Sequence, residues 1–197
     1  MLPAHKSKIE KAKNMALKAT IFKAELQVSD MDRNYYQSHG LTIARHPSET
    51  DERMMVRILA FALYAHEALA FGKGLSADDE PDLWRRDLTG AIELWIDVGL
   101  PDEKRIRKAC GRAAQVVVIS YGGRGAEIWW DQMSSLLGRF RNLTVLNLPA
   151  AAGQVLTGMA QRNMQLQCLI QDGQMWLGDQ DERMEVVLAP LKTPLPK

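Results

Sequence analysis

The 197-residue sequence is poor in the residues that build metal centres and covalent cross-links. Its two cysteines, Cys110 and Cys168, form no Cys-x-x-Cys motif, so we expect two buried thiols in a reducing compartment rather than a disulfide or a zinc site. Its four histidines show neither His-x-x-x-His nor His-Glu-x-x-His spacing, which argues against a histidine-rich metal site.

Long hydrophobic runs and a strong net charge are also missing. No run of about 18 apolar residues is present, so we expect no membrane partner, and the lysine-rich amino terminus lacks the apolar stretch of a secretory signal. These absences predict a cytoplasmic location. The formal net charge is only +1, so any surface that binds nucleic acid must be local.

The sequence does contain the mixture of residues that is typical of a folded domain, with 46% hydrophobic and 25% charged residues. The length is sufficient for one domain with a sizeable core. We expect a flexible basic extension at residues 1–14, a single domain at residues 15–191 and a tail at residues 192–197.

The hydrophobic pattern changes repeatedly between the two-residue period of strands and the longer period of helices. It predicts an α/β (α+β) fold in which helices flank a central mixed sheet, with a β-rich C-terminal end. The longest helix is expected to be central because most of its surface is apolar, with Ser48 as its cap and Asp51 completing a capping box. The predicted helices are 49–70, 101–114, 125–138 and 150–162, and the predicted strands are 19–28, 40–44, 83–88, 91–100, 115–122, 143–148, the hairpin 164–178 and 183–191.

Two carboxylates lie at opposite ends of the predicted hairpin formed by the strands 83–88 and 91–100. Asp82 stands at the entry to the first strand, and Asp97 stands near the end of the second. Carboxylates that share a site repel one another unless a proton or a cation neutralises them. Oxygen-rich clusters suit Mg²⁺ or Mn²⁺, which can support phosphodiester cleavage. We therefore predict Asp82 and Asp97 as metal ligands, and the acidic run before the hairpin adds Asp79 as a third.

The central helix contributes a further acid, Glu52, which is aligned with the core-facing stripe of the helix. It could reach over the sheet edge and assist catalysis at Asp82 and Asp97. The alternative is that Glu52 is a first-turn residue that interacts with the helix dipole.

A basic stripe follows the second strand of the hairpin. Arg105, Lys108 and Arg112 lie on one side of the helix 101–114, with Lys104 beside them, and they could contact phosphate groups of a nucleic acid. Trp95 shares a strand face with Asp97 and is the best candidate to stack on a base. The alternative for the basic stripe is an ordinary solvated helix face.

The order of these features resembles the core of PD-(D/E)xK nucleases. Such a core has a helix with an acid, a hairpin with Pro-Asp and then Asp/Glu-x-Lys, and a further helix and strand; here Pro81-Asp82 and Asp97 match the acidic motifs. Gly99 stands where the motif has lysine. The resemblance implies either that Lys104 or Lys108 supplies the missing charge, or that the site is catalytically inactive.

A longer resemblance covers residues 15–190. The segments MALKATIFKAELQVSDMDRN, LTIARHPSETDERMMVRILAFALYA, IELWIDVGLPDEKRIRKAC and LQCLIQDGQMWL, in this order, are similar to the bacterial YaeQ family. This resemblance implies a YaeQ-type variant of the PD-(D/E)xK fold in a small cytosolic protein.

Three functions remain open at this point. The first is a metal-dependent nuclease-like phosphodiesterase in which Glu52, Asp82, Asp97 and either Lys108 or Lys104 act in catalysis. The second is an inactive nuclease scaffold that serves nucleic-acid binding or transcription-related regulation. The third is a protein-interaction adaptor in which the charged residues form internal ion pairs.

Overall fold

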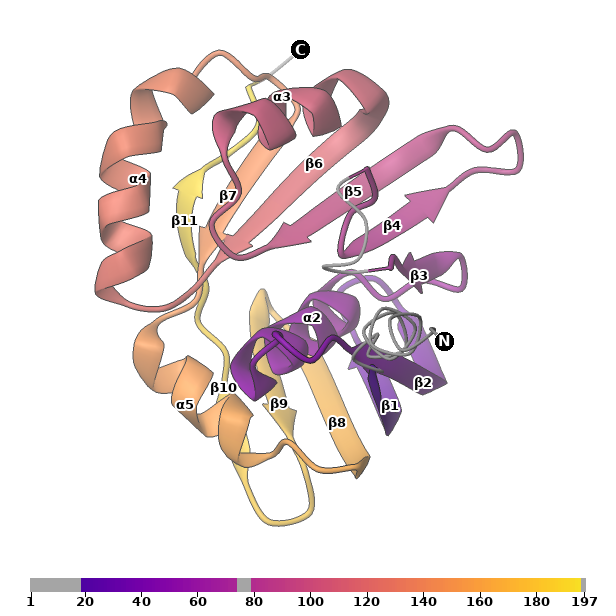
Figure 1. The fold of residues 1–197 in the computed structure, drawn as a ribbon. Helices are drawn as coiled ribbons and strands as arrows, with labels where there is room; N and C mark the ends of the chain where they lie inside the picture. Colours follow the sequence, from indigo (N-terminus) through magenta and orange to yellow (C-terminus); the bar gives the residue numbers. More distant parts are fainter. Residues whose placement is uncertain (1–18, 74–78, 196–197) are drawn as a thin grey trace, which may run out of the picture.

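The structure is a computed structural model that describes residues 19–73 and 79–195. The predicted extension at residues 1–14 lies outside these residues. The described part folds into two mixed sheets and four helices (Figure 1), which confirms the mixed α+β class but gives two sheets where one central sheet was predicted.

The first sheet has five strands in the order β10-β9-β8-β1-β2. β1 and β2 form an antiparallel hairpin over their full lengths, and β1 pairs in parallel with β8. The predicted hairpin at residues 164–178 is confirmed as β8 and β9, which turn at Asp172 and Gly173. The strands are β1 (Thr20–Asp30), β2 (Tyr35–Arg45), β8 (Asn163–Gln171), β9 (Gln174–Gly178) and β10 (Arg183–Glu185).

The second sheet has six strands in the order β11-β7-β6-β5-β4-β3. β5, β6 and β7 are parallel and are joined by α3 and α4, while β4 and β3 extend the sheet as antiparallel strands. Its strands are β3 (Leu69–Phe71), β4 (Leu83–Arg86), β5 (Ile92–Val98), β6 (Ala113–Ser120), β7 (Leu143–Asn147) and β11 (Ala189–Lys192), and the four helices of the described residues are α2 (Asp51–Leu63), α3 (Glu103–Arg112), α4 (Arg124–Leu137) and α5 (Ala150–Gly158).

The elements stack so that α2 lies between the two sheets (Figure 1). All nine residues from Met54 to Ala62 are buried, as the apolar surface of this helix predicts. α3 and α4 cover the opposite face of the six-stranded sheet and form a second core with residues such as Trp95 and Val118. The six-stranded sheet is therefore covered on both faces, and its parallel strands are correspondingly apolar.

Several element boundaries differ from the sequence prediction; for example, β2 begins at Tyr35 rather than at Gly40, and α5 ends at Gly158 rather than at residue 162. α2 begins after Thr50, whose hydroxyl accepts a hydrogen bond from the Arg53 amide at 3.2 Å, so Ser48 is not the cap. The helix ends at Leu63, because part of the apolar run that follows forms β3 instead. The predicted strand 183–191 is divided into β10 and β11, which pair with different sheets.

The two cysteines are free thiols, as predicted. Cys168 is buried and Cys110 is half-buried, and burial raises their pKa values to about 12 and about 11 respectively. Within the described ranges, no helix is long and apolar enough to cross a membrane.

Candidate functional site

Asp82 lies at the start of β4, where its side chain continues the hydrogen-bond ladder to β5. The Asp82 amide donates to the carbonyl of Ile96 at 3.0 Å, and the amide of Val98 donates to Asp82 Oδ2 at 2.8 Å. Asp82 is only 2% exposed. The carboxylate is therefore fixed by the strand itself before any other side chain contacts it.

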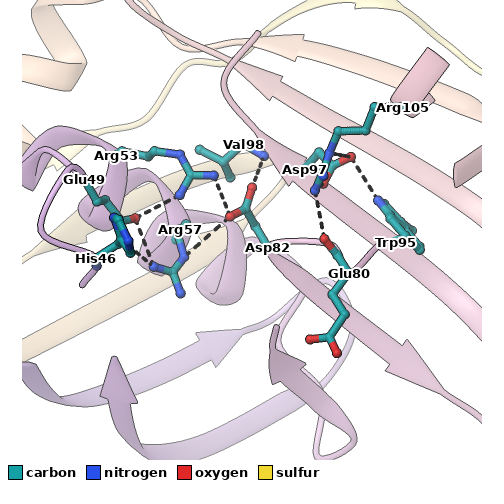
Figure 2. Close-up of polar contacts among 10 residues, drawn as sticks. All are labelled: His46, Glu49, Arg53, Arg57, Glu80, Asp82, Trp95, Asp97, Val98 and Arg105. Atoms are coloured by element: carbon teal, nitrogen blue, oxygen red, sulfur yellow. Dashed lines mark hydrogen bonds and ion pairs between the residues drawn. The ribbon is translucent and has the colours of Figure 1, made fainter. Parts of the chain in front are cut away.

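Two arginines of α2 approach Asp82 from the side of the five-stranded sheet (Figure 2). Arg53 Nη2 donates to Asp82 Oδ1 at 2.7 Å, and Arg57 Nε lies 3.8 Å from the same oxygen. The same two guanidinium groups bind Glu49, with Nη1 to Oε1 distances of 3.0 Å for Arg53 and 2.9 Å for Arg57. We call Glu49, Arg53, Arg57 and Asp82 the inner ion-pair group.

Glu49, Arg53 and Arg57 were not predicted as site residues. Their spacing of four residues is the signal that could have indicated them, because on the predicted helix 49–70 it would place an acid and two bases in one line. The stronger signal would have been the position of Arg57 within the apolar stretch of α2, where a charged side chain requires a partner. In the structure Arg57 is 1% exposed, and its Nε has no hydrogen-bond partner among the described residues.

Asp97 is neutralised from the opposite face of the six-stranded sheet. Arg105 of α3 donates from Nη2 to Asp97 Oδ1 at 2.7 Å and from Nε to Asp97 Oδ2 at 3.0 Å. Arg105 also donates to the carbonyl of Glu80 at 2.9 Å, and the Trp95 indole donates to Asp97 Oδ2 at 2.9 Å (Figure 2). We call Trp95, Asp97 and Arg105 the outer ion-pair group.

The predicted role of Trp95 in base stacking does not agree with its position. Trp95 is 1% exposed, so a base has no access to its ring, and the Arg112 guanidinium lies 5.4 Å from the ring centroid. The alternation of side chains on β5 is nevertheless as predicted, because Leu94 and Ile96 pack into the core on the other face.

Asp79 lies at the surface and does not join Asp82 and Asp97 in a shared ligand set. It forms an ion pair with Lys108, and its carbonyl accepts a hydrogen bond from Arg112 at 3.1 Å. The hydrogen bond from Lys108 and the charge of that lysine lower the pKa of the Asp79 carboxyl. Lys108 is one of the two lysines predicted to supply the missing charge of the motif lysine, and it is thus paired with Asp79 at the surface.

Glu52 and Lys104 are also separate from the two buried aspartates. Glu52 is half-buried and packs against Gly153 of α5, at a place where a Cβ would meet its carboxylate. Lys104 is exposed on α3. Neither residue forms a hydrogen bond or an ion pair with Asp82 or Asp97.

Burial dominates the electrostatics of the inner group. It raises the pKa of the Asp82 carboxyl above its ordinary value, and nearby Asp97 adds to this effect, while Arg53 and the Val98 amide oppose it. Burial acts to lower the pKa of Arg53, but Asp82 and Glu49 outweigh it and raise that pKa. Burial also raises the pKa of Tyr121, which lies near this group.

The donor set does not fit a Mg²⁺ or Mn²⁺ ion in this arrangement. Both oxygens of Asp82 and both oxygens of Asp97 accept bonds from protein N–H groups. In residues 19–73 and 79–195, no group of three or more His, Cys, Asp and Glu side chains is placed to hold a metal ion. Gly99 has a φ of +111°, a conformation that a lysine at this position would rarely adopt.

The fold and the site define a class of protein with two mixed sheets, a helix between them and buried arginine–carboxylate pairs at the start of the β4–β5 hairpin. The sequence model of the family described as YaeQ protein matches residues 15–188. The chain belongs to the YaeQ family.

Bacterial relatives match over almost the whole chain. The Uncharacterized protein YaeQ of Escherichia coli K12 is 50% identical over 180 residues, which cover 91% of this chain and 99% of the relative. The crystal structure of a YaeQ protein from Xanthomonas axonopodis pv. citri is 52% identical with a TM-score of 0.84, covering 90% of this chain and 99% of that chain. A YaeQ protein from Pseudomonas syringae is 36% identical with a TM-score of 0.85, covering 89% of this chain and 97% of that chain.

Proposed function

We propose that this chain is a nucleic-acid-binding protein built on a catalytically inactive nuclease-like core. The observation that carries the proposal is the pairing of Asp82 and Asp97 with Arg53 and Arg105. A hydrolytic metal centre needs carboxylate oxygens that are free to bind the cation. Here those oxygens already serve guanidinium and amide donors, so the acids act as structural anchors.

The proposed binding surface is the exposed side of α3. This helix holds five basic residues and a single acid in ten residues, and the bases Lys104, Arg107, Lys108 and Arg112 are exposed. A local cluster of this kind binds phosphates and releases their counterions, even when the net charge of the protein is near zero. The previously predicted contact Arg105 serves Asp97 instead, and its side chain is 28% exposed.

The test is a fluorescence-anisotropy titration of labelled single-stranded and duplex DNA and RNA at several salt concentrations. We expect binding that weakens with salt, and we expect the variant Lys104→Glu/Arg107→Glu to reduce the slope of log K against log salt by about 2. This change would measure the phosphate contacts that the two side chains make.

The matched control is Lys23→Glu/Arg183→Glu, which makes the same change in net charge at exposed residues of the five-stranded sheet. The control should bind like the wild type. Equal losses in both variants would mean that only net charge matters, and no binding by the wild type would contradict the proposal and favour the protein-interaction adaptor.

A metal-dependent phosphodiesterase is the second candidate. It is favoured by one observation, the position of Asp82 and Asp97 at neighbouring strands in the chain order of a PD-(D/E)xK core. Its catalytic residues would be those predicted from the sequence, including Glu52 and either Lys104 or Lys108.

Calorimetry with Mg²⁺ and Mn²⁺ separates the two candidates. Metal binding by the wild type that is lost in Asp82→Ala/Asp97→Ala, together with metal-dependent cleavage of an oligonucleotide, would support the phosphodiesterase. Nucleic-acid binding without metal affinity or cleavage would support the inactive scaffold.

A single domain over residues 15–191 and a cytoplasmic location remain predictions.

A further inference from the structure

A cavity of about 730 Å³ lies at the end of the six-stranded sheet away from the ion-pair groups, beside the C-terminal end of α2. The strand register places four of its lining residues, Arg85, Gln115, Val117 and Thr144, on one face of the sheet. Arg85 of β4 is opposite Leu94 of β5, which is opposite Gln115 of β6, and the next row pairs Val117 of β6 with Thr144 of β7. The volume is within the range of small-molecule sites, about 300–1,000 Å³.

The Arg85 guanidinium group binds Glu93 through Nε, and its two Nη groups can bind a ligand. Its Nε donates to Glu93 Oε2 at 2.8 Å, and its side chain is 25% exposed. Its two Nη groups form no hydrogen bond or ion pair with any other residue that the structure describes. A guanidinium group oriented in this way can bind both oxygens of a carboxylate or a phosphate group.

Further polar side chains converge on the same cavity. Tyr64, Gln115 and Thr144 are among its lining residues, and their side-chain polar groups have no hydrogen-bond partner within the described ranges. Burial raises the pKa of Tyr64 to about 12, so its hydroxyl is protonated at neutral pH and can donate.

The remaining lining combines the apolar residues Ala114, Val117, Pro194 and Leu195 with the polar residues Glu93, Arg141 and Asn142. Val117 forms the floor, and the segment that follows β11 closes one side with Pro194 and Leu195. This segment is fixed to the sheet by a hydrogen bond from the Leu195 amide to the Arg141 carbonyl at 3.0 Å. The cavity therefore has apolar walls, convergent polar groups and two lining arginines, of which Arg85 is paired with Glu93, and apolar walls with a few placed polar groups are usual in small-ligand sites.

We propose that this cavity binds a small organic anion, with its carboxylate or phosphate group on the Nη groups of Arg85 and its apolar body against Val117 and Leu195. Tyr64, Gln115 and Thr144 select for further polar atoms of the ligand. The site is separate from α3, so the proposal does not depend on nucleic-acid binding.

The test uses three probes that share a naphthalene body: 1-naphthoate, 1-naphthyl phosphate and the neutral 1-naphthamide. Each is titrated into ¹⁵N-labelled protein, and the amide signals are followed by NMR. We expect saturable shifts centred on Gln115 and Thr144 for an anion, with affinity for the amide at least ~10-fold weaker because it lacks the charge that Arg85 recognises. The tighter of the two anions identifies the headgroup.

The variant Arg85→Met should weaken the anions by ~10-fold to ~100-fold and leave the amide unchanged, because a hydrogen bond to a charged group is lost. The matched control is Arg86→Met on the same strand. The Arg86 guanidinium stacks 3.7 Å from the ring centroid of Trp84, and Arg86 is not among the residues that line the cavity. Tyr64→Phe removes only a hydroxyl, so it is a second test of ligand binding by the cavity that carries little risk to folding.

Three results would overturn the proposal. The first is the absence of saturable shifts with either anion up to about 10 mM, the weak end of measurable affinity. The second is equal binding by the wild type and Arg85→Met, and the third is a shift pattern centred away from Gln115 and Thr144.

Discussion

Asp82 and Asp97 are equally buried, at 2% exposure each, but they are neutralised from opposite faces of the six-stranded sheet. Asp82 meets arginines of α2, whose side chains are 14% and 2% exposed. Asp97 meets Arg105 of α3, which is 28% exposed. The two sites differ in the exposure of the arginine partners rather than in that of the acid, because both inner arginines are less exposed than Arg105.

This difference decides what the loss of each carboxylate would do. An arginine that loses its partner inside the protein keeps a charge that water cannot reach, whereas an arginine near the surface can be hydrated. The inner group should therefore act as a structural unit, and the outer group should tolerate change. The predictions below test this contrast.

The largest effect is expected for Asp82→Asn. Asn offers one acceptor oxygen where Asp82 offers two, so either the Arg53 guanidinium or the Val98 amide loses its buried hydrogen bond at every pH, and we expect a loss of about 3–5 kcal/mol in the free energy of unfolding. Urea unfolding at pH 7 measures it. Adding Arg53→Met should recover part of the loss, because the remaining charges of Glu49 and Arg57 then balance. A double mutant in which the two losses simply add would show that Asp82 and Arg53 do not act together.

A smaller effect is expected for Asp97→Asn. The new side chain can still accept a hydrogen bond from Trp95, and Arg105 can turn toward water, so we expect a loss of about 1–3 kcal/mol by the same unfolding measurement. Asp79→Asn serves as the control, because a fully exposed ion pair contributes little to stability. A loss equal to that of Asp82→Asn would remove the contrast between the two groups.

The pH dependence of stability should have opposite signs at Asp82 and Asp79. The pKa of Asp82 is raised in the folded protein, so its contribution is fully present below its ordinary value of 3.8 and is lost as pH rises through the folded pKa. The pKa of Asp79 is lowered, so its contribution is present above 3.8 and is lost as pH falls through the folded pKa.

Chemical-shift titration of the two carboxyl groups by NMR gives the direction of each pKa shift directly. Urea unfolding of wild type and Asp82→Asn between pH 3 and pH 7, a range chosen around the ordinary carboxyl pKa of about 4, should show a difference that narrows as pH rises. A difference that widens would mean that Arg53 and the Val98 amide outweigh the burial of Asp82.

The smallest effect concerns Glu52, which the structure separates from both groups. Gly153→Ala should change the free energy of unfolding by less than about 0.5 kcal/mol, because the gain in helix propensity is offset by displacement of Glu52. In a Glu52→Ala background the same change should stabilise the protein by about 0.5–1 kcal/mol. Gly158→Ala, which meets no neighbouring atom within 4 Å, should act equally in both backgrounds.

The strand β5 could be read from the sequence in detail. Alternation alone placed Trp95 and Asp97 on one face and Leu94 and Ile96 on the other, and the structure agrees. The apolar surface of α2 likewise predicted a buried helix. Both predictions succeed because they depend on the period of side chains along a single element.

The partners of the charged residues could not be predicted in this way. Arg53 reaches Asp82 across 29 residues, and Lys108 reaches Asp79 across the same separation. An acid on a hairpin can meet a metal ion, an arginine or a lysine, and its local sequence is the same in each case. Glu52 illustrates the limit, because its alignment with the core stripe led it to Gly153 rather than to the aspartates.

The sequence by itself determined most of the elements, the buried faces of β5 and α2 and the family, because these follow from local periodicity and from similarity along the chain. The tertiary structure decided which cation neutralises which acid, and so whether the carboxylates of the hairpin are free to hold a metal. That choice depends on how α2 and α3 pack against the two faces of one sheet, and packing between elements distant in sequence is not encoded in any short motif.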